Sequence, residues 1–467
     1  MSKPRIMFAA PKSGSGKTVL TCAFLQIMKF RGIKARSMKC GPDYIDPMFH
    51  RKVLGIPARN VDLYFTNEEV TKALFHLEEE DYELTVMEGV MGLYDGLAGV
   101  REEASSYHMA KTLKMPIVLI VNAKGMGRSV LAEIAGFLSM DHEKRIRGVL
   151  LNQVSKAQYE GIAPIIEKEL GIEALGYFPG QKEIELESRY LGLKLPFEID
   201  GLRAKVIGVA KQLEESARID RILQIAEEEN EKYPYVAKEY SWLSGPKEQT
   251  GEKVRIGVAM DEAFCFYYED NFRLFQNAGA EIVFFSPLHD KELPTGLSGI
   301  LLGGGYPEMF AKELSENVGM RNSIKDAISS GMPSLAECGG FMYLHDALNP
   351  LVGEAYPMVG VVSGTCKNAG KLVRFGYCTY RFPKEFEQPD GAASEVEKPC
   401  EVHAHEFHYF ESTACGEDCT AEKPVTGRSW ACGYFAEDHF WSFGHLYYPS
   451  NPGFANWFVE RCKAFRP

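Results

Sequence analysis

Residues 10–18, with the sequence APKSGSGKT, are of the types that bind phosphate groups. Small residues in such a loop let backbone N–H groups approach a phosphate, a lysine reaches the terminal phosphates, and the following hydroxyl ligates Mg²⁺. A strand pattern precedes the loop and a helical pattern follows it, which is the order that a phosphate loop requires. We therefore predict an ATP site that uses Mg²⁺, with these cofactor-binding residues: Gly14, Ser15, Gly16, Lys17 and Thr18.

Pro11 and Lys12 distinguish this loop from a standard phosphate loop. Pro11 stands where the pattern G-x-x-x-x-G-K-[ST] has its first glycine, so the motif is a deviant phosphate loop. Lys12 lies where some ATPases related to partitioning proteins carry a second lysine that reaches a partner's nucleotide. A solvated surface lysine is the alternative, and one residue is weak support for the first reading.

Acidic residues follow two further strand patterns, in KCGPDYIDPMFH (Lys39–His50) and MEGVMGLYDG (Met87–Gly96). Because ligands of open α/β sheets bind at the carboxyl ends of the strands, both loops should lie beside the phosphate loop. Carboxylates there can hold Mg²⁺ or orient an attacking group. For the aspartate beside a proline, capping of its own turn is an equal alternative. The candidates are Asp43, Asp46, Glu88 and Asp95.

A second chemical centre is predicted around Cys338, in PSLAECGGFMYL. The neighbouring residues indicate strand, tight turn and helix, so we expect the turn to expose a nucleophile at a helix N-terminus, where the dipole favours the thiolate. His445, in GHLYYPSNP, is a plausible base for this thiol. A buried cysteine that only packs is the alternative. Backbone N–H groups for an oxyanion hole would come from Gly303, Gly304, Gly305 and Gly339.

Histidines and cysteines near the C-terminus form two weaker candidates for a metal site. EVHAHEFHY places His403 and His405 on one face of a strand and His408 on the other, which favours ordinary strand histidines. Cys415 and Cys419 have loose spacing for zinc. We expect neither group to bind a metal.

These residues must be positioned by an alternation of strands and helices. In the first half, short β-branched runs such as RIMFAA, KARSMK, LTVMEG, PIVLIVNA and RGVLLNQV are separated by helical stretches, which predicts a mostly parallel α/β sheet. A polar stretch rich in Gly and Pro then precedes VRIGVAM, where the pattern starts again. We expect two α/β domains, at 1–227 and 253–467, joined by a linker at 228–252.

Composition limits the classes of protein that remain. The chain has 467 residues, 45% of them hydrophobic and 25% charged, which is ordinary for a globular protein of two or more domains. The formal net charge of −12 argues against nucleic acid as the main partner. The start lacks a signal-peptide pattern, the apolar runs are too short to span a membrane, and the 11 cysteines follow no disulfide framework. We therefore expect a cytoplasmic protein with reduced thiols.

In these motifs the chain resembles the cobyrinic acid a,c-diamide synthase family of ATP-dependent glutamine amidotransferases. The likeness runs nearly end to end, through SGSGKT, KCGPDYIDPMFH, EGVMGLYDG, AFCFYYEDN, LLGGGYPE, AECGGFMYL, HEFHY and GHLYYPSNP. The resemblance implies an N-terminal P-loop domain similar to dethiobiotin synthetase and a C-terminal class I glutamine amidotransferase domain. The partners that it implies are cobyrinate, L-glutamine and ATP, with a homodimer as one permitted assembly and neither nucleic acid nor membrane.

The resemblance also assigns roles to residues. Cys338 would attack the glutamine side-chain amide with His445 as base, and the ammonia released would displace phosphate from an acyl phosphate made with ATP. Glu88 would hold Mg²⁺ with Thr18, Asp46 and Asp95 would orient the substrate carboxylate or ammonia, and Asp43 and Tyr44 would bind substrate. Most class I glutaminases have Glu two residues after the catalytic histidine, where this chain has Tyr447.

Three alternatives stay open at this point. Nickel-sirohydrochlorin a,c-diamide synthases have the same motifs and perform the same reaction on another macrocycle. Cobyric acid synthase is a weaker rival, because GPDYIDPMFH better resembles the a,c-diamide type. A partitioning-type ATPase switch would use the phosphate loop and Lys12, but it would leave the second half of the chain without a role.

Overall fold

The protein is described from a computed structural model, which covers residues 3–179, 196–234, 238–245, 253–350 and 353–466. The chain divides into two compact units. Unit 1 comprises Met1–Leu63 and Asn67–Lys238, and unit 2 comprises Tyr64–Thr66 and Glu239–Pro467. The division after Lys238 lies inside the range expected to be a linker. The first residues of that range are helical, because α8 continues to Lys232.

Unit 1 is built on a seven-stranded sheet in the order β3-β2-β4-β1-β5-β6-β7, and all of its strand pairs are parallel. The five strands expected from sequence are confirmed, and β3 and β7 extend the sheet at its two edges. The strands are β1 (Arg5–Ala9), β2 (Ala35–Cys40), β3 (Ala58–Val61), β4 (Leu84–Glu88), β5 (Ile117–Asn122), β6 (Ile146–Asn152) and β7 (Glu173–Phe178).

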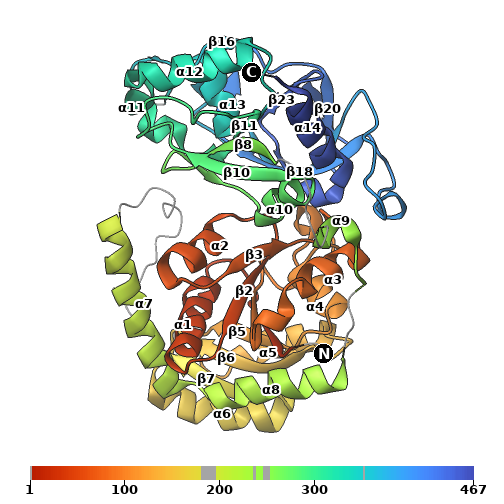
Figure 1. The fold of residues 1–467 in the computed structure, drawn as a ribbon. Coiled ribbons are helices and arrows are strands. Elements are labelled where there is room, and N and C mark those ends of the chain that lie inside the picture. The colour runs from red at the N-terminus through yellow and green to blue at the C-terminus, as the bar shows by residue number, and fades with distance from the viewer. Residues whose placement is uncertain (1–2, 180–195, 235–237, 246–252, 351–352, 467) are drawn as a thin grey trace. The chain divides into compact units, whose positions relative to one another are not determined.

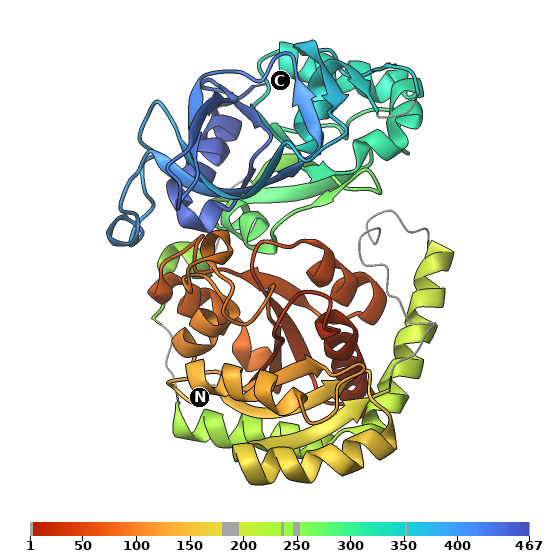
Figure 2. The same ribbon diagram turned by 180° about the vertical axis from the view of Figure 1, so that it is seen from behind.

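Helices cover both faces of this sheet (Figure 1 and Figure 2). Along β1, Ile6 and Phe8 join the core formed with α1, α7 and α8, whereas Met7 and Ala9 join the core formed with α4, α5 and α6. A strand buried on both faces tends to be rich in apolar residues, as β5 (Ile117–Asn122) is, whereas β2 and β4 also carry buried charged residues. The helices are α1 (Lys17–Phe30), α2 (Ile45–Phe49), α3 (Glu68–His76), α4 (Ser106–Thr112), α5 (Val130–Met140), α6 (Lys156–Leu170), α7 (Pro196–Ser216) and α8 (Ile219–Lys232).

Unit 2 contains a six-stranded sheet in the order β10-β8-β11-β13-β23-β22, parallel except for the last pair. Its strands are β8 (Val254–Ala259), β10 (Ala280–Phe285), β11 (Gly299–Leu302), β13 (Ser334–Glu337), β22 (Tyr434–Phe435) and β23 (His439–Ser442). The helices of this unit are α9 (Ser241–Ser244), α10 (Glu269–Asn277), α11 (Ala311–Glu316), α12 (Val318–Ser329), α13 (Gly339–Leu344) and α14 (Pro452–Ala464).

Smaller sheets carry the β-rich C-terminal sequence. In one of them, β18 pairs with β17 and with the short strand that contains His445. These smaller sheets are formed by β9 (Phe264–Phe266), β12 (Gly304–Gly305), β14 (His345–Asn349), β15 (Tyr356–Pro357), β16 (Val362–Asn368), β17 (Arg374–Arg381), β18 (Glu401–His408), β19 (Phe410–Ser412), β20 (Cys419–Glu422), β21 (Ser429–Cys432) and β24 (His445–Leu446). In the residues that the structure describes, no helix has the length and apolar character that crossing a membrane would need.

Candidate functional site

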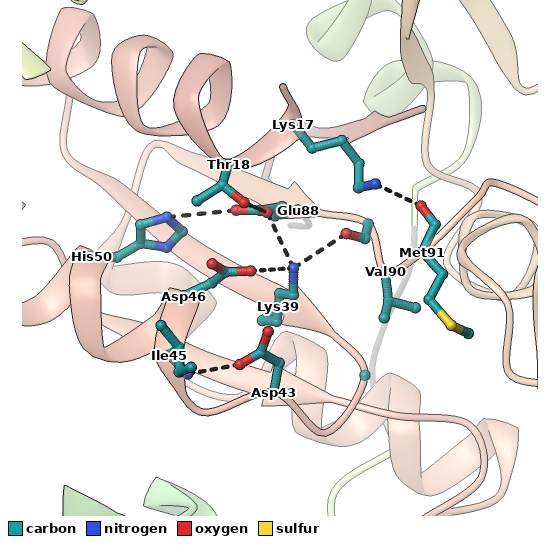
Figure 3. A network of polar contacts seen from close by, with 12 residues as sticks. Lys17, Thr18, Lys39, Asp43, Ile45, Asp46, His50, Glu88, Val90 and Met91 are labelled. Atoms are coloured by element: carbon teal, nitrogen blue, oxygen red, sulfur yellow. Dashed lines mark hydrogen bonds and ion pairs between the residues drawn. The ribbon is translucent and has the colours of Figure 1, made fainter. Parts of the chain in front are cut away.

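The strand order of unit 1 brings the predicted phosphate loop and the acidic loops to one edge of the sheet. Strand β4 lies between β2 and β1, so the residues that follow all three strands meet at their carboxyl ends. Glu88 on β4 is in register with Lys39 on β2 and with Phe8 on β1. Figure 3 shows the side chains that converge there.

The phosphate loop is held by backbone conformation and by one amide side chain. Gly16 has φ 97°, and a Cβ at this position would lie 2.3 Å from Nδ2 of Asn152. The same Nδ2 donates to the Ser15 carbonyl at 2.8 Å. The loop therefore needs a glycine at position 16 for both its conformation and its packing.

Lys17 is buried and donates from Nζ to the carbonyl of Met91 at 2.6 Å. Burial lowers the pKa of Lys17 to about 8, and the neighbouring Lys39 adds to the decrease. An incoming phosphate would favour the charged form, so this lysine is suited to bind an anion. Lys12 is exposed to solvent.

Lys39 is the centre of the polar network. It is only 4% exposed, and its Nζ lies 2.5 Å from Oδ2 of Asp46 and 3.1 Å from Oε1 of Glu88. Burial alone would lower the pKa of Lys39, but the two carboxylates outweigh burial and raise it above the usual lysine value. Sequence reasoning missed this residue, although it begins the motif KCGPDYIDPMFH.

Glu88 connects this network to the phosphate loop. The Thr18 hydroxyl donates to Glu88 Oε1 at 2.6 Å. Burial raises the pKa of Glu88 to about 7, and repulsion from Asp46 acts in the same direction. His50 Nε2 lies 3.7 Å from Glu88 Oε2, and burial lowers the pKa of this histidine to about 4, so it is neutral near pH 7.

The remaining acidic candidates, Asp43 and Asp95, lie near this polar network, and each also accepts a backbone N–H within its own turn. Asp43 Oδ1 accepts the backbone N–H of Ile45 at 2.8 Å, which is the turn-capping role considered above. Burial, followed by repulsion from Asp46, raises the pKa of Asp43 to about 6. Asp95 Oδ2 accepts the backbone N–H of Gly92 at 3.0 Å. The resemblance gave Tyr44 a substrate-binding role, and the structure places it in a buried position before α2.

The oxygen donors beside the phosphate loop fit Mg²⁺. The hydroxyl of Thr18 and the carboxylate of Glu88 are hard donors that already lie side by side. The residues that the structure describes contain no group of three or more His, Cys, Asp or Glu able to hold a metal ion. Mg²⁺ beside a nucleotide does not need such a cage, because it is commonly held by one or two protein ligands with phosphates and water.

In unit 2, Cys338 occupies the predicted turn between strand β13 and helix α13. Its backbone has φ 47° and ψ −102°, a conformation that is strained for a residue with a side chain. Two backbone hydrogen bonds hold the turn, from Cys338 N to Ser442 O at 2.8 Å and from Gly340 N to Gly303 O at 2.9 Å. A Cβ at Gly340 would lie 2.0 Å from the carbonyl oxygen of Leu302, so only glycine fits there.

The predicted oxyanion hole becomes smaller in the structure. The N–H of Gly303 donates to the Tyr267 hydroxyl at 2.9 Å, so this group is already engaged. A Cβ on Gly339 would lie 3.1 Å from the backbone nitrogen of Gly305, which shows how close these two glycines are. The candidate donors are therefore Gly304, Gly305 and Gly339.

His445 packs against this glycine loop. A Cβ on Gly304 would lie 2.1 Å from Cε1 of the His445 ring. Burial lowers the pKa of His445 to about 4, and burial raises the pKa of Cys338 above the ordinary thiol value. Burial therefore opposes the thiolate that we expected the helix N-terminus to favour, and it also opposes protonation of the imidazole.

Two further residues bear on how the histidine is oriented. Tyr447, at the position where a glutamate is usual, donates its hydroxyl to Asp270 Oδ2 at 2.9 Å. Glu337, the residue before Cys338, places Oε2 at 4.0 Å from Nδ1 of His445. Sequence reasoning missed Glu337, because only the return of β24 to this place reveals its neighbour.

Two protein-family models match different parts of the chain. Residues 6–193 match the model described as CobQ/CobB/MinD/ParA nucleotide binding domain. Residues 255–429 match the model described as CobB/CobQ-like glutamine amidotransferase domain.

Curated relatives match almost the whole chain. A cobyrinate a,c-diamide synthase of Caldanaerobacter subterraneus subsp. tengcongensis is 36% identical over 98% of this chain and 98% of its own length. A protein of the same name from Listeria innocua is 36% identical over 96% of this chain and 97% of its own length. The one from Clostridium tetani is 34% identical over 98% of this chain and 99% of its own length.

Proposed function

The chain belongs to the family of cobyrinate a,c-diamide synthases, and we propose that it converts the a and c carboxylates of cobyrinate to amides, with glutamine as nitrogen donor and ATP as energy source. It is a carbon–nitrogen ligase with a nucleotide-binding domain and a glutamine amidotransferase domain. The observation that carries the proposal is that a phosphate loop with converging carboxylates and a strained cysteine turn are present in one chain.

In unit 2, Cys338 would release ammonia from glutamine. As the thiol sulfur bonds to the side-chain amide carbon, its proton passes to His445. The backbone N–H groups of the glycine loop would stabilise the negative charge on the amide oxygen. His445 then gives the proton to the departing nitrogen, which leaves as ammonia, and water hydrolyses the remaining thioester to glutamate and free thiol.

In unit 1, the phosphate loop would hold ATP while a carboxylate of cobyrinate attacks the γ-phosphorus. The bond to the β-phosphate oxygen breaks and ADP leaves, which gives an acyl phosphate. Ammonia then bonds to the acyl carbon, loses a proton, and expels inorganic phosphate to leave the amide. Each amide therefore consumes one ATP and one ammonia.

The chain's own residues divide this work. Lys17 would bind the transferred phosphoryl group, while Asp46 and Asp95 would orient the carboxylate or ammonia. Mg²⁺, held by Thr18 and Glu88, supplies neutralisation of phosphate charge when bound. Asp43 and Tyr44 would contact the substrate from the loop after β2.

Mass spectrometry of cobyrinate incubated with the protein, Mg-ATP and glutamine tests the proposal. Replacement of two carboxylates by amides supports it, with release of ADP, phosphate and glutamate in equal amounts. A parallel incubation with nickel-sirohydrochlorin decides between the two macrocycles. If only nickel-sirohydrochlorin is amidated, the protein acts in the synthesis of the nickel cofactor instead. If the protein dimerises in a nucleotide-dependent way and amidates neither macrocycle, the partitioning-type ATPase switch is favoured.

A further inference from the structure

We infer that Glu337 is the positioning residue of His445 and takes the place of the acid that most class I glutaminases carry two residues after the catalytic histidine. This inference rests on the proposed function, because it assigns a role within glutamine hydrolysis. The carboxylate would accept a hydrogen bond from Nδ1–H of His445, so that Nε2 has the free lone pair that takes the thiol proton.

The fold places this carboxylate beside the histidine by a direct route. Glu337 is the last residue of β13 and is in register with Ser442 on the neighbouring strand β23. From there the chain needs only three residues to reach His445 at the start of β24. The same turn that strains the cysteine therefore brings the preceding carboxylate to the imidazole, with Oε2 at 4.0 Å from Nδ1.

Glu337 is also fixed at its other oxygen. The Tyr448 hydroxyl donates to Oε1 at 3.0 Å, and Glu337 as a whole residue is only 5% exposed. A buried side chain tied at Oε1 has little freedom to turn Oε2 elsewhere. The separation of 4.0 Å is longer than a hydrogen bond, and such contacts often shorten when the substrate completes a site.

Two other buried acids, Asp270 and Glu406, have different hydrogen-bond partners. Asp270 accepts the Tyr447 hydroxyl at 2.9 Å. Glu406 accepts the Tyr380 hydroxyl at 2.6 Å, and its Oε2 lies 3.7 Å from His408 Nε2. Glu406 is the rival for the proposed role, because its charge also acts on His445.

The test compares Glu337→Gln with Glu406→Gln in the full chain. We expect Glu337→Gln to lower kcat for glutamine hydrolysis about 10²- to 10⁴-fold with little change in KM, because an amide can donate to Nδ1 and favour the wrong tautomer. Amidation driven by free ammonia should be kept, which shows that unit 1 is intact, and unchanged tryptophan fluorescence should show that unit 2 is folded, because all four tryptophans lie in unit 2. ¹⁵N NMR of histidine-labelled protein should show the His445 proton leaving Nδ1 in this variant only.

Each other result overturns the inference. If Glu337→Gln hydrolyses glutamine like the parent protein, or if its lower rate comes without a change of tautomer, Glu337 has no positioning role. If Glu406→Gln gives the loss and the tautomer change, that residue is the acid instead. Absence of glutamine hydrolysis by the unsubstituted protein would instead contradict the proposed function, so the two failures are distinguishable.

Discussion

Lys39 and Glu88 face each other in register on the neighbouring strands β2 and β4, and Nζ of the lysine lies 3.1 Å from Oε1 of the glutamate. Because Oε1 also accepts the hydroxyl of Thr18, the ammonium group and the phosphate loop share one oxygen. A second carboxylate, that of Asp46, lies 2.5 Å from the same ammonium. Binding of a metal ion or a nucleotide beside the Glu88 carboxylate would therefore change the electrostatic environment of the Lys39 ammonium group.

Removing the Lys39 ammonium should destabilise unit 1 and stop amidation. Lys39→Met leaves Asp46 and Glu88 as buried carboxylates without their cation, for which a loss of about 3–5 kcal/mol is expected. Hydrogen exchange of the β4 peptide measures the effect in unit 1, and ammonia-driven amidation measures the effect on activity. Lys205→Met, on the exposed side of α7, is the matched control and should behave like the parent protein. Unchanged exchange and amidation in Lys39→Met would contradict a central role for this lysine.

Replacing Cys338, the proposed nucleophile, should separate the two proposed reactions. Cys338→Ser is expected to abolish glutamine hydrolysis, because a serine hydroxyl is a far weaker nucleophile with this base. Amidation with added ammonia should continue, since the phosphate loop and its carboxylates belong to unit 1. Cys415→Ser, at an exposed cysteine, serves as control. Loss of ammonia-driven amidation in a folded Cys338→Ser protein would contradict the scheme of two separate centres.

Glutamine hydrolysis should persist at a pH where an ordinary histidine is already protonated. Burial lowers the pKa of His445 to about 4 from the usual 6.5, so its neutral, proton-accepting form remains as the pH falls. We expect the acidic decline of kcat/KM below about pH 5, measured between pH 4 and 8 with tryptophan fluorescence to exclude unfolding. A midpoint near pH 6.5 would show that the active base is not buried in this way.

The sequence predicted the parts of these sites that lie in contiguous motifs, and it missed the parts that depend on pairing between distant strands. The phosphate loop and the cysteine turn are written in contiguous residues, because each needs glycines beside its reactive side chain. The role of Lys39 depends on β4 lying between β1 and β2. This strand order cannot be inferred from any short segment of the sequence. Likewise, Gly303 appeared available for an oxyanion hole until the structure placed the Tyr267 hydroxyl against its N–H.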